Sequence, residues 1–451
     1  MPEAFDLLIR GGTVVTGSGM ARADVGVRGE AVAAVAPDLP SEGAKRVVDA
    51  TGQYVLPGII DVHVHPVYLD NIYHASLSGA FGGTTTLIHY AYARPGMKVL
   101  ETIKQFRDDG LQNSLTDFGL HAGLFDVANQ IEELPRAFDL GVTSFKVFMT
   151  YAKLKWMTDD YWLMAVLDVV GQEGGLVAVH AENGLATDYL EDKFNRLGMS
   201  PLEVFTRTRP DVLEAEATHR AIAMAQVAGC ALYIPHISAA KALDPIRRAR
   251  ESGQVVYAET CPQYLTLTEE ILWKRGPQAK IGPPIRTPRD LDGLWEAIQD
   301  GTMDTVASDH APKPKEVDDD FFEAAYGSPQ VETVLTVTYD AGVNRGRIGV
   351  PRLVQLLSEN PAKIFGYYPK KGTIAPGSDA DLVLFDPAAP HTIQQTTQHS
   401  QANYTLYEGR QCLGKPTWVM QRGRVLIEEG QLAAEPGQAR YLPTRAATQG
   451  I

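Results

Sequence analysis

Cysteine is scarce in this sequence, because only Cys230, Cys261 and Cys412 occur among 451 residues, and they lie far apart. Their odd number and wide spacing argue against a disulfide framework and against a zinc site made of paired thiolates, and they fit a reducing compartment. Long apolar runs are also missing, since no stretch of about 18 apolar residues could span a membrane. We therefore expect a protein without a membrane segment.

Positive charge is in the minority, with 41 lysines and arginines against 55 acidic residues and a formal net charge of -14. No basic cluster offsets this balance, so we expect no nucleic-acid partner. The opening segment, MPEAFDLLIRGG, carries acids and only a short apolar run, unlike a secretory signal peptide. These features predict a cytoplasmic globular protein.

The middle of the chain, from about Leu56 to Tyr368, alternates short apolar runs with helical patterns, whereas both ends show short β-type runs separated by turns. Alternating strands and helices are typical of βαβ units around a parallel sheet. Eight strand-like runs predict a closed barrel, and they read, in order, IIDVHVH, TTTLIHY, TDFGLHA, TSFKVFM, LVAVHAE, ALYIPHI, VVYAET and DTVASDH.

Polar side chains stand at the ends of these runs, where a parallel barrel gathers its functional groups. The first run ends in His63 and His65, which are two residues apart and so point to the same side of a strand. Four further runs supply one polar group each, namely Lys146, His180, His236 and Asp309. Imidazoles and a carboxylate suit zinc or a related divalent ion.

Lys146 does not fit such a set as an ammonium group, because a cation cannot bind a metal. It fits if its neutral amine adds carbon dioxide to form a carbamate, an anion whose two oxygens can each bind one metal ion. Structural roles are the alternative for each residue: a hydrogen-bonded core histidine, an ion-paired lysine, or a turn cap for Asp309. The shared position of all six residues at strand ends favours the metal site.

Several segments resemble the amidohydrolase superfamily, most closely the cyclic amidases called hydantoinases or dihydropyrimidinases. These segments span nearly the whole chain and include PGIIDVHVHP, SFKVFMTY, VHAENG, ETCPQYL, SDHAP and KKGTIAPGSDADLVLFDP. The resemblance implies an α/β fold with a distorted (β/α)8 TIM-like barrel over residues 56–368. It also implies a small β-sandwich domain formed by residues 1–55 and 369–430, a C-terminal tail over residues 431–451, and a homotetramer.

The same resemblance implies a site with two divalent metal ions, usually zinc. One metal would be held by His63, His65 and Asp309, the other by His180 and His236, and carboxylated Lys146 (N6-carboxylysine) and a hydroxide would bridge both. The bridging hydroxide would attack the amide bond of a cyclic amide substrate.

Two further roles follow from the resemblance. Asp309 would take the proton of the attacking hydroxide and pass it to the leaving nitrogen. Tyr151 matches the family tyrosine that donates to the oxyanion of the tetrahedral intermediate. The alternative for Tyr151 is an aromatic lid residue without a catalytic hydrogen bond.

Two positions of the substrate-binding region depart from the hydantoinase pattern. Gly282, in KIGPPIR, takes the place of a serine, and Tyr326, in YGSPQVE, takes the place of an asparagine. Backbone contacts to the substrate can survive both changes, but the tyrosine alters the shape of the imide-binding end. The ring is therefore left open among hydantoins, dihydropyrimidines and related cyclic imides.

Alternatives within and outside this class remain. Dihydroorotase is disfavoured because Val67 stands where its usual arginine would be, while allantoinase or a hydrolase of another amide is compatible with the motifs. The superfamily also resembles the collapsin response mediator proteins, which are non-catalytic scaffolds that have lost metal ligands. All six ligand positions are occupied here, which disfavours the scaffold.

Overall fold

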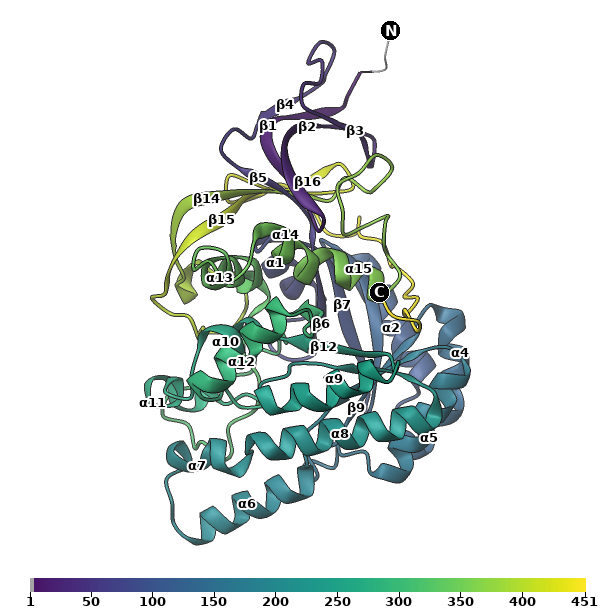
Figure 1. Ribbon diagram of the computed structural model, residues 1–451, viewed down its shortest axis with the longest axis vertical. Coiled ribbons are helices and arrows are strands. Elements are labelled where there is room, and N and C mark those ends of the chain that lie inside the picture. Colours follow the sequence, from purple (N-terminus) through teal and green to yellow (C-terminus); the bar gives the residue numbers. More distant parts are fainter. Residues whose placement is uncertain (1–3) are drawn as a thin grey trace.

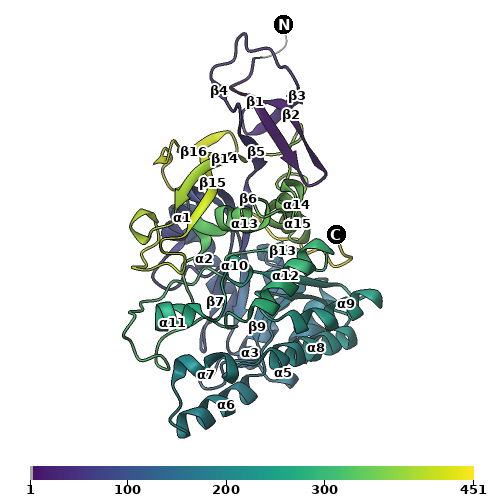
Figure 2. The same cartoon turned by 60° about the vertical axis from the view of Figure 1, so that its left-hand side comes forward.

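The computed structural model describes residues 4–451, which form a parallel barrel and a separate mixed sheet. Figure 1 places the barrel in the lower part of the view and the mixed sheet, drawn in purple and yellow, above it. The turned view of Figure 2 shows the same two layers. The predicted α/β class is thus confirmed, with both chain ends contributing to the second sheet.

The barrel contains eight strands, which pair in sequence order. They are β6 (Ile59–Val64), β7 (Thr84–Ala93), β8 (Asp117–Leu124), β9 (Ser144–Phe148), β10 (Leu176–His180), β11 (Ala231–Ile234), β12 (Val256–Thr260) and β13 (Thr305–Val306). A parallel bridge between Val64 and His310 joins the first strand to the segment after the last and closes the ring. Each of the eight predicted runs overlaps one strand, and β7 and β8 extend beyond the ends of their runs. Their residues are buried on both faces, which explains why they read as nearly continuous apolar runs.

Helices follow the strands and cover the barrel from outside (Figure 1). The longer ones are α1 (Ile72–Phe81), α2 (Val99–Asn113), α5 (Asp160–Gln172), α6 (Gly184–Arg196), α7 (Pro201–Thr208), α8 (Asp211–Ala228), α9 (Leu243–Glu251), α12 (Pro288–Gln299) and α13 (Val334–Gly342). Shorter ones are α3 (Val127–Gln130), α4 (Leu134–Ala137), α10 (Pro262–Thr266), α11 (Ile271–Arg275), α14 (Val350–Val354) and α15 (Asn360–Ile364).

Local sequence determines where these helices begin and end. Asp159 caps the start of α5 by accepting from the amide of Trp162, and Gly229 ends α8 in the left-handed conformation. Within residues 4–451, none of these helices combines the length and apolar character that crossing a membrane requires.

The second sheet joins strands from the two ends of the chain. Its order is β17-β16-β15-β14-β5-β1-β2-β3, with β4 beside β1. The N-terminal strands are β1 (Leu7–Thr16), β2 (Gly19–Arg28), β3 (Ala31–Ala36), β4 (Val47–Asp49) and β5 (Tyr54–Pro57), and the C-terminal ones are β14 (Leu382–Thr392), β15 (Gln411–Gln421), β16 (Arg424–Glu428) and β17 (Gln431–Leu432). The sheet therefore reaches two residues into the segment expected as a tail.

A buried ionic cluster ties the barrel to this sheet. The ammonium of Lys371 lies 2.9 Å from Asp117 at the start of β8 and 2.7 Å from Asp381, next to β14. Asp379 and Arg422 complete the cluster, and the guanidinium of Arg422 donates to Asp117. Burial opposes charge on Asp117, but Lys371 and Arg422 outweigh it and hold the pKa of Asp117 below its usual value.

Candidate active site

One cavity of about 510 Å³ lies among the segments that follow the barrel strands. All six residues predicted as metal ligands line it: His63, His65, Lys146, His180, His236 and Asp309. His63 belongs to β6, Lys146 to β9 and His180 to the end of β10, whereas His236 and Asp309 follow β11 and β13. The structure thus brings together groups that are up to 246 positions apart in the sequence, as Asp309 and His63 are.

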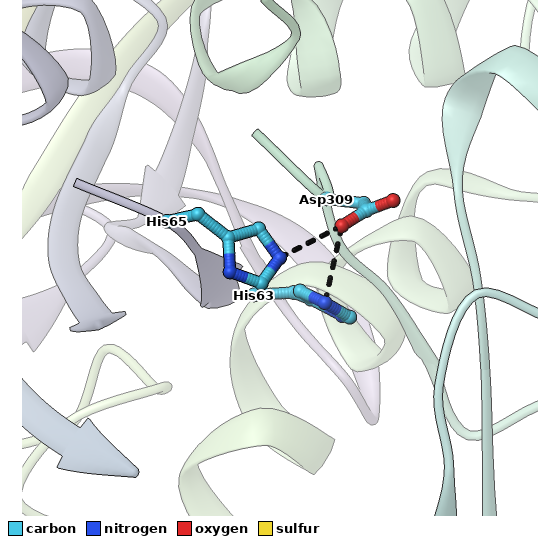
Figure 3. Close-up of side chains that lie close together, drawn as sticks. All are labelled: His63, His65 and Asp309. Carbon is cyan, nitrogen blue, oxygen red and sulfur yellow. Dashed lines mark hydrogen bonds and ion pairs between the residues drawn. The ribbon is translucent and has the colours of Figure 1, made fainter. Parts of the chain in front are cut away.

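Three of these residues form a compact group that could hold one metal ion. Their candidate ligand atoms on His63, His65 and Asp309 lie within 4.8 Å of one another. Figure 3 shows both imidazoles directed toward the same carboxylate oxygen, at 3.2 Å from Nε2 of His63 and 3.0 Å from Nε2 of His65. The expectation that His63 and His65 share one side of their strand matches this geometry.

The second nitrogen of each imidazole has its own partner. Nδ1 of His63 lies 2.6 Å from a carboxylate oxygen of Glu259. Nδ1 of His65 forms a hydrogen bond of 2.6 Å with the hydroxyl of Tyr92. Such contacts fix the ring orientation and leave the opposite nitrogen free to face the cavity. Both Nε2 atoms are therefore presented to one point beside Asp309.

Negative charge is concentrated around His63. Burial disfavours its protonation, but the carboxylates of Glu259 and Asp309 outweigh burial and raise the pKa of His63 to about 9. Burial dominates for His65, whose pKa falls to about 3. The acidic pair thus creates a position where a cation is favoured.

Lys146, His180 and His236 form the other side of the group. The amine nitrogen of Lys146 lies 3.3 Å from Nε2 of His236, and the rings of His180 and His236 have centroids 4.4 Å apart. Nε2 of His180 lies 2.7 Å from the carboxylate of Glu182. Burial lowers the pKa of Lys146 to about 8, so a larger fraction of this amine is neutral, and therefore reactive, near neutral pH.

These residues fit a divalent metal by their chemistry and by two unmatched atoms. Nε2 of His63 and Nδ1 of His236 are buried and have no hydrogen-bond partner among residues 4–451. An unmatched buried polar atom is costly, and it is often explained by a ligand or an ion. Imidazole nitrogens with one carboxylate are the donors that zinc accepts in proteins.

The backbone is strained at this site. Tyr151, His236 and Asp309 all have positive φ angles, of 67°, 42° and 52°. A non-glycine residue in the left-handed region costs on the order of 1–3 kcal/mol, and such residues cluster where a side chain must be aimed at a ligand. All three residues were assigned to catalysis or metal binding from the sequence, and all three have a left-handed backbone conformation that packing alone does not require.

Tyr151 and Gly282 meet at one wall of the cavity. A Cβ atom added to Gly282 would lie 2.5 Å from the hydroxyl oxygen of Tyr151, closer than such contacts allow. The glycine therefore leaves room for the tyrosine hydroxyl. The ring of Tyr326 lies 5.4 Å from that of Tyr151, and its hydroxyl accepts from the guanidinium of Arg209 at 3.1 Å.

The residues that contact and orient the predicted metal ligands were not predicted from the sequence. Glu259 accepts from the backbone amide of His236 and from Tyr233 besides contacting His63. Arg209 pairs at 2.9 Å with Glu182, the residue that contacts His180. An acid inside the apolar run VVYAET was a usable signal for Glu259, but Arg209 lies after α7 in a segment without any motif.

Comparisons with known proteins give a consistent result. The model of the amidohydrolase family matches residues 54–426. The chain is 39% identical to a D-hydantoinase of Ralstonia pickettii, over 98% of this chain and 99% of that protein, and 32% identical to an L-hydantoinase of Paenarthrobacter aurescens, over 98% of each. A solved D-hydantoinase structure matches with a TM-score of 0.94 at 40% identity, covering 99% of this chain and 100% of that one. A dihydropyrimidinase from Brevibacillus agri matches with a TM-score of 0.92 at 37% identity, covering 97% and 98%.

Proposed function

Because the chain belongs to the amidohydrolase family, we propose that it hydrolyses the ring amide bond of a cyclic amide of the hydantoin or dihydropyrimidine class. The convergence of six ligand-type residues on one cavity carries this proposal. It is supported by full-length similarity to D-hydantoinases, an L-hydantoinase and a dihydropyrimidinase. Because both D- and L-selective relatives match, the proposal includes no stereochemical preference.

The cavity would hold two divalent metal ions, with zinc best suited to the donors. His63, His65 and Asp309 would bind one ion, His180 and His236 the other, and Lys146, carboxylated by carbon dioxide, would bind both. When bound, such a pair supplies Lewis acidity and lowers the pKa of a nearby water to about 7.

The protein's own groups would move the proton and stabilise the developing charge. The carboxylate of Asp309 accepts the proton of the attacking water and returns it to the ring nitrogen as the C–N bond breaks. Tyr151 donates its hydroxyl hydrogen to the carbonyl oxygen as that oxygen becomes negative. Burial raises the pKa of Tyr151 well above its usual value, which keeps the hydroxyl protonated as a donor.

Gly282 and Tyr326 would shape the end of the cavity that holds the imide part of the ring. Backbone groups near both residues would make the hydrogen bonds, because glycine has no side chain and the hydroxyl of Tyr326 already accepts from Arg209. We also propose a cytoplasmic location and a homotetramer, as in the sequence-based expectation.

A hydrolysis screen tests the proposal. Zinc-loaded protein would be assayed with hydantoin, dihydrouracil, allantoin, dihydroorotate and a succinimide, and ring opening would be followed by chromatography. Among the rings without an ionised substituent, we expect hydantoin or dihydrouracil to be opened fastest. Preferential opening of allantoin would support the allantoinase alternative, and no turnover of any ring would refute cyclic amide hydrolysis.

A further inference from the structure

Besides Lys146, the cavity has two lysines whose ammonium groups lack a carboxylate partner. Lys280 and Lys313 both line it, and no carboxylate of residues 4–451 lies within 4 Å of either ammonium. Other cations around the cavity are neutralised: Lys153 pairs with Glu191 at 2.9 Å, and Arg209 pairs with Glu182 at 2.9 Å. Apart from Lys146, Lys280 and Lys313 are therefore the lining cations without a directly paired carboxylate, although the carboxylates of Asp188 and Glu323 also line the cavity.

Lys280 already has a structural partner. Its ammonium donates to the backbone carbonyl of Phe322 at 2.7 Å and lies 4.6 Å from the centroid of the Tyr326 ring. Lys315, which is also buried, donates to the carbonyls of Gln278 and Lys280 and holds the same segment. Both lysines thus have backbone acceptors that explain their positions.

Lys313 differs, because no backbone or side-chain oxygen of residues 4–451 accepts from its ammonium. The nitrogen lies 3.4 Å from the centroid of the Tyr68 ring, and Tyr68 and Lys313 both line the cavity that contains Asp309. A cation over an aromatic face is held in place while its N–H donors that point away from the ring stay available. The half-buried lysine is thus fixed at the cavity wall with donors unused.

A second cation lies near this point. Burial lowers the pKa of Lys313 to about 8, and the positive charge of exposed Arg94 adds to that effect. Arg94 follows β7, and no carboxylate of residues 4–451 pairs with its guanidinium. The carboxylate of Asp309 raises the pKa of Lys313 and offsets part of this effect, but it does not pair directly with the ammonium. An anion bound between the cavity and Arg94 would relieve the remaining repulsion between the two cations.

We propose that Lys313, held over Tyr68, binds a carboxylate carried by the ring substituent of the substrate. The preferred substrates would then be cyclic amides with an anionic substituent rather than with an apolar one. This inference rests on the proposed ring-opening activity and specifies the substrate class of the same cavity. A charge-assisted hydrogen bond of this kind favours the anionic substrate by about 10- to 100-fold.

A matched substrate pair tests the inference. Racemic hydantoin-5-acetate and hydantoin-5-acetamide have nearly the same size and differ in one negative charge, so their kcat/KM ratio isolates the charge. We expect the wild-type enzyme to favour the acetate at least about 10-fold at low salt, with the preference falling as ionic strength rises. Equal rates, or faster opening of the acetamide or of a phenyl-substituted hydantoin, would overturn the inference.

Variants identify the residue responsible. Lys313→Met should reduce the acetate preference at least about 10-fold, whereas Lys313→Arg should keep most of it. Lys104→Met, which removes an exposed lysine of α2 that is not part of the cavity lining, should leave the ratio unchanged. A preference that survives Lys313→Met would assign anion binding elsewhere and contradict the proposal.

Calorimetry separates this inference from the proposed activity. If neither ring is opened, the ring-opening proposal fails, but the affinities of the two compounds still differ if Lys313 binds the carboxylate. Tighter binding of the acetate by wild-type protein, lost in Lys313→Met, would support the anion site on its own. Equal affinities would refute it.

Discussion

The amine nitrogen of Lys146 lies 3.3 Å from Nε2 of His236 in a fully buried position, and no carboxylate of residues 4–451 lies within 4 Å of it. Burial lowers the pKa of Lys146 to about 8. A permanent ammonium there would be an unpaired buried charge beside a cluster of imidazoles, which is costly. A carbamate, stabilised by metal ions, removes that cost.

Replacement of Lys146 tests the bridging role. We expect Lys146→Ala to lose most bound metal, measured by elemental analysis, and to lower kcat by at least about 100-fold. Short carboxylic acids such as acetate should restore part of both, because they replace the carbamate oxygens. The Lys104→Ala control should bind metal normally, and a Lys146→Ala enzyme that keeps two metals and full activity without rescue would contradict the bridge.

Glu259 should determine how tightly the first metal is bound. Its carboxylate lies 2.6 Å from Nδ1 of His63, so Glu259→Gln removes the charge that orients and polarises that imidazole. Loss of such a contact typically weakens metal affinity by about 10- to 100-fold. Titration with a competing chelator measures this, with Glu251→Gln, an exposed change on α9, as the control. Unchanged affinity in Glu259→Gln would rule out this role.

Tyr151 should act mainly in the transition state. We expect Tyr151→Phe to lower kcat by about 100- to 1,000-fold and to change KM little, because the hydroxyl donates to charge that develops during the reaction. Steady-state kinetics measures both parameters. Tyr161→Phe, at a side chain that is 73% exposed, is the matched control. A rise in KM with unchanged kcat would instead assign Tyr151 to substrate binding.

Gly282 should act through Tyr151. A Cβ atom at this position would lie 2.5 Å from the tyrosine hydroxyl, so Gly282→Ala should displace that group and lower kcat by about 10-fold. In the Tyr151→Phe background the same change should cost much less, because the displaced hydroxyl is already gone. Gly19→Ala, where nothing lies within 4 Å of the added Cβ, serves as the control. Additive effects would show that Gly282 acts independently.

Lys371 should stabilise the joint between barrel and sheet in a pH-dependent way. At pH 7, Lys371→Met leaves Asp117 and Asp381 without this counter-ion and should lower the free energy of unfolding by about 3–5 kcal/mol. The pKa of Asp117 is lower in the folded chain than its usual 3.8, so its stabilising contribution is complete above pH 3.8 and is lost as pH falls through the folded pKa. The difference between wild type and variant should therefore shrink in acid.

Urea unfolding at several pH values measures this difference. Lys370→Met is the neighbouring control, since Lys370 is 63% exposed and its pair with Asp379 should contribute at most about 1 kcal/mol. A penalty for Lys371→Met that stays constant from pH 7 to pH 3 would contradict the electrostatic explanation.

Much of the fold could be predicted from sequence. The eight apolar runs correspond to the eight barrel strands, and helix ends follow local signals such as Asp159 and Gly229. Family resemblance, carried by motifs such as PGIIDVHVHP and SFKVFMTY, is confirmed by the full-length matches. These features are predictable because strand period, capping and motif spacing are local properties of the chain.

The supporting contacts could not be predicted in this way. Arg209 meets Glu182 across 27 positions, and Gly282 makes room for Tyr151 across 131 positions, without any motif that links them. Lys313 could be read from sequence only as one lysine in APKPK, and its place over Tyr68 depends on the two loops that meet at the barrel's end.

The sequence by itself determined the order of strands and helices, the family and the set of residue types suited to divalent metals. Tertiary structure alone decided which of those groups face one another, which charges are neutralised and which are left unpaired. The physical reason is that hydrophobic periodicity and capping act over a few residues, whereas electrostatic pairing depends on distances that exist only after the barrel has closed.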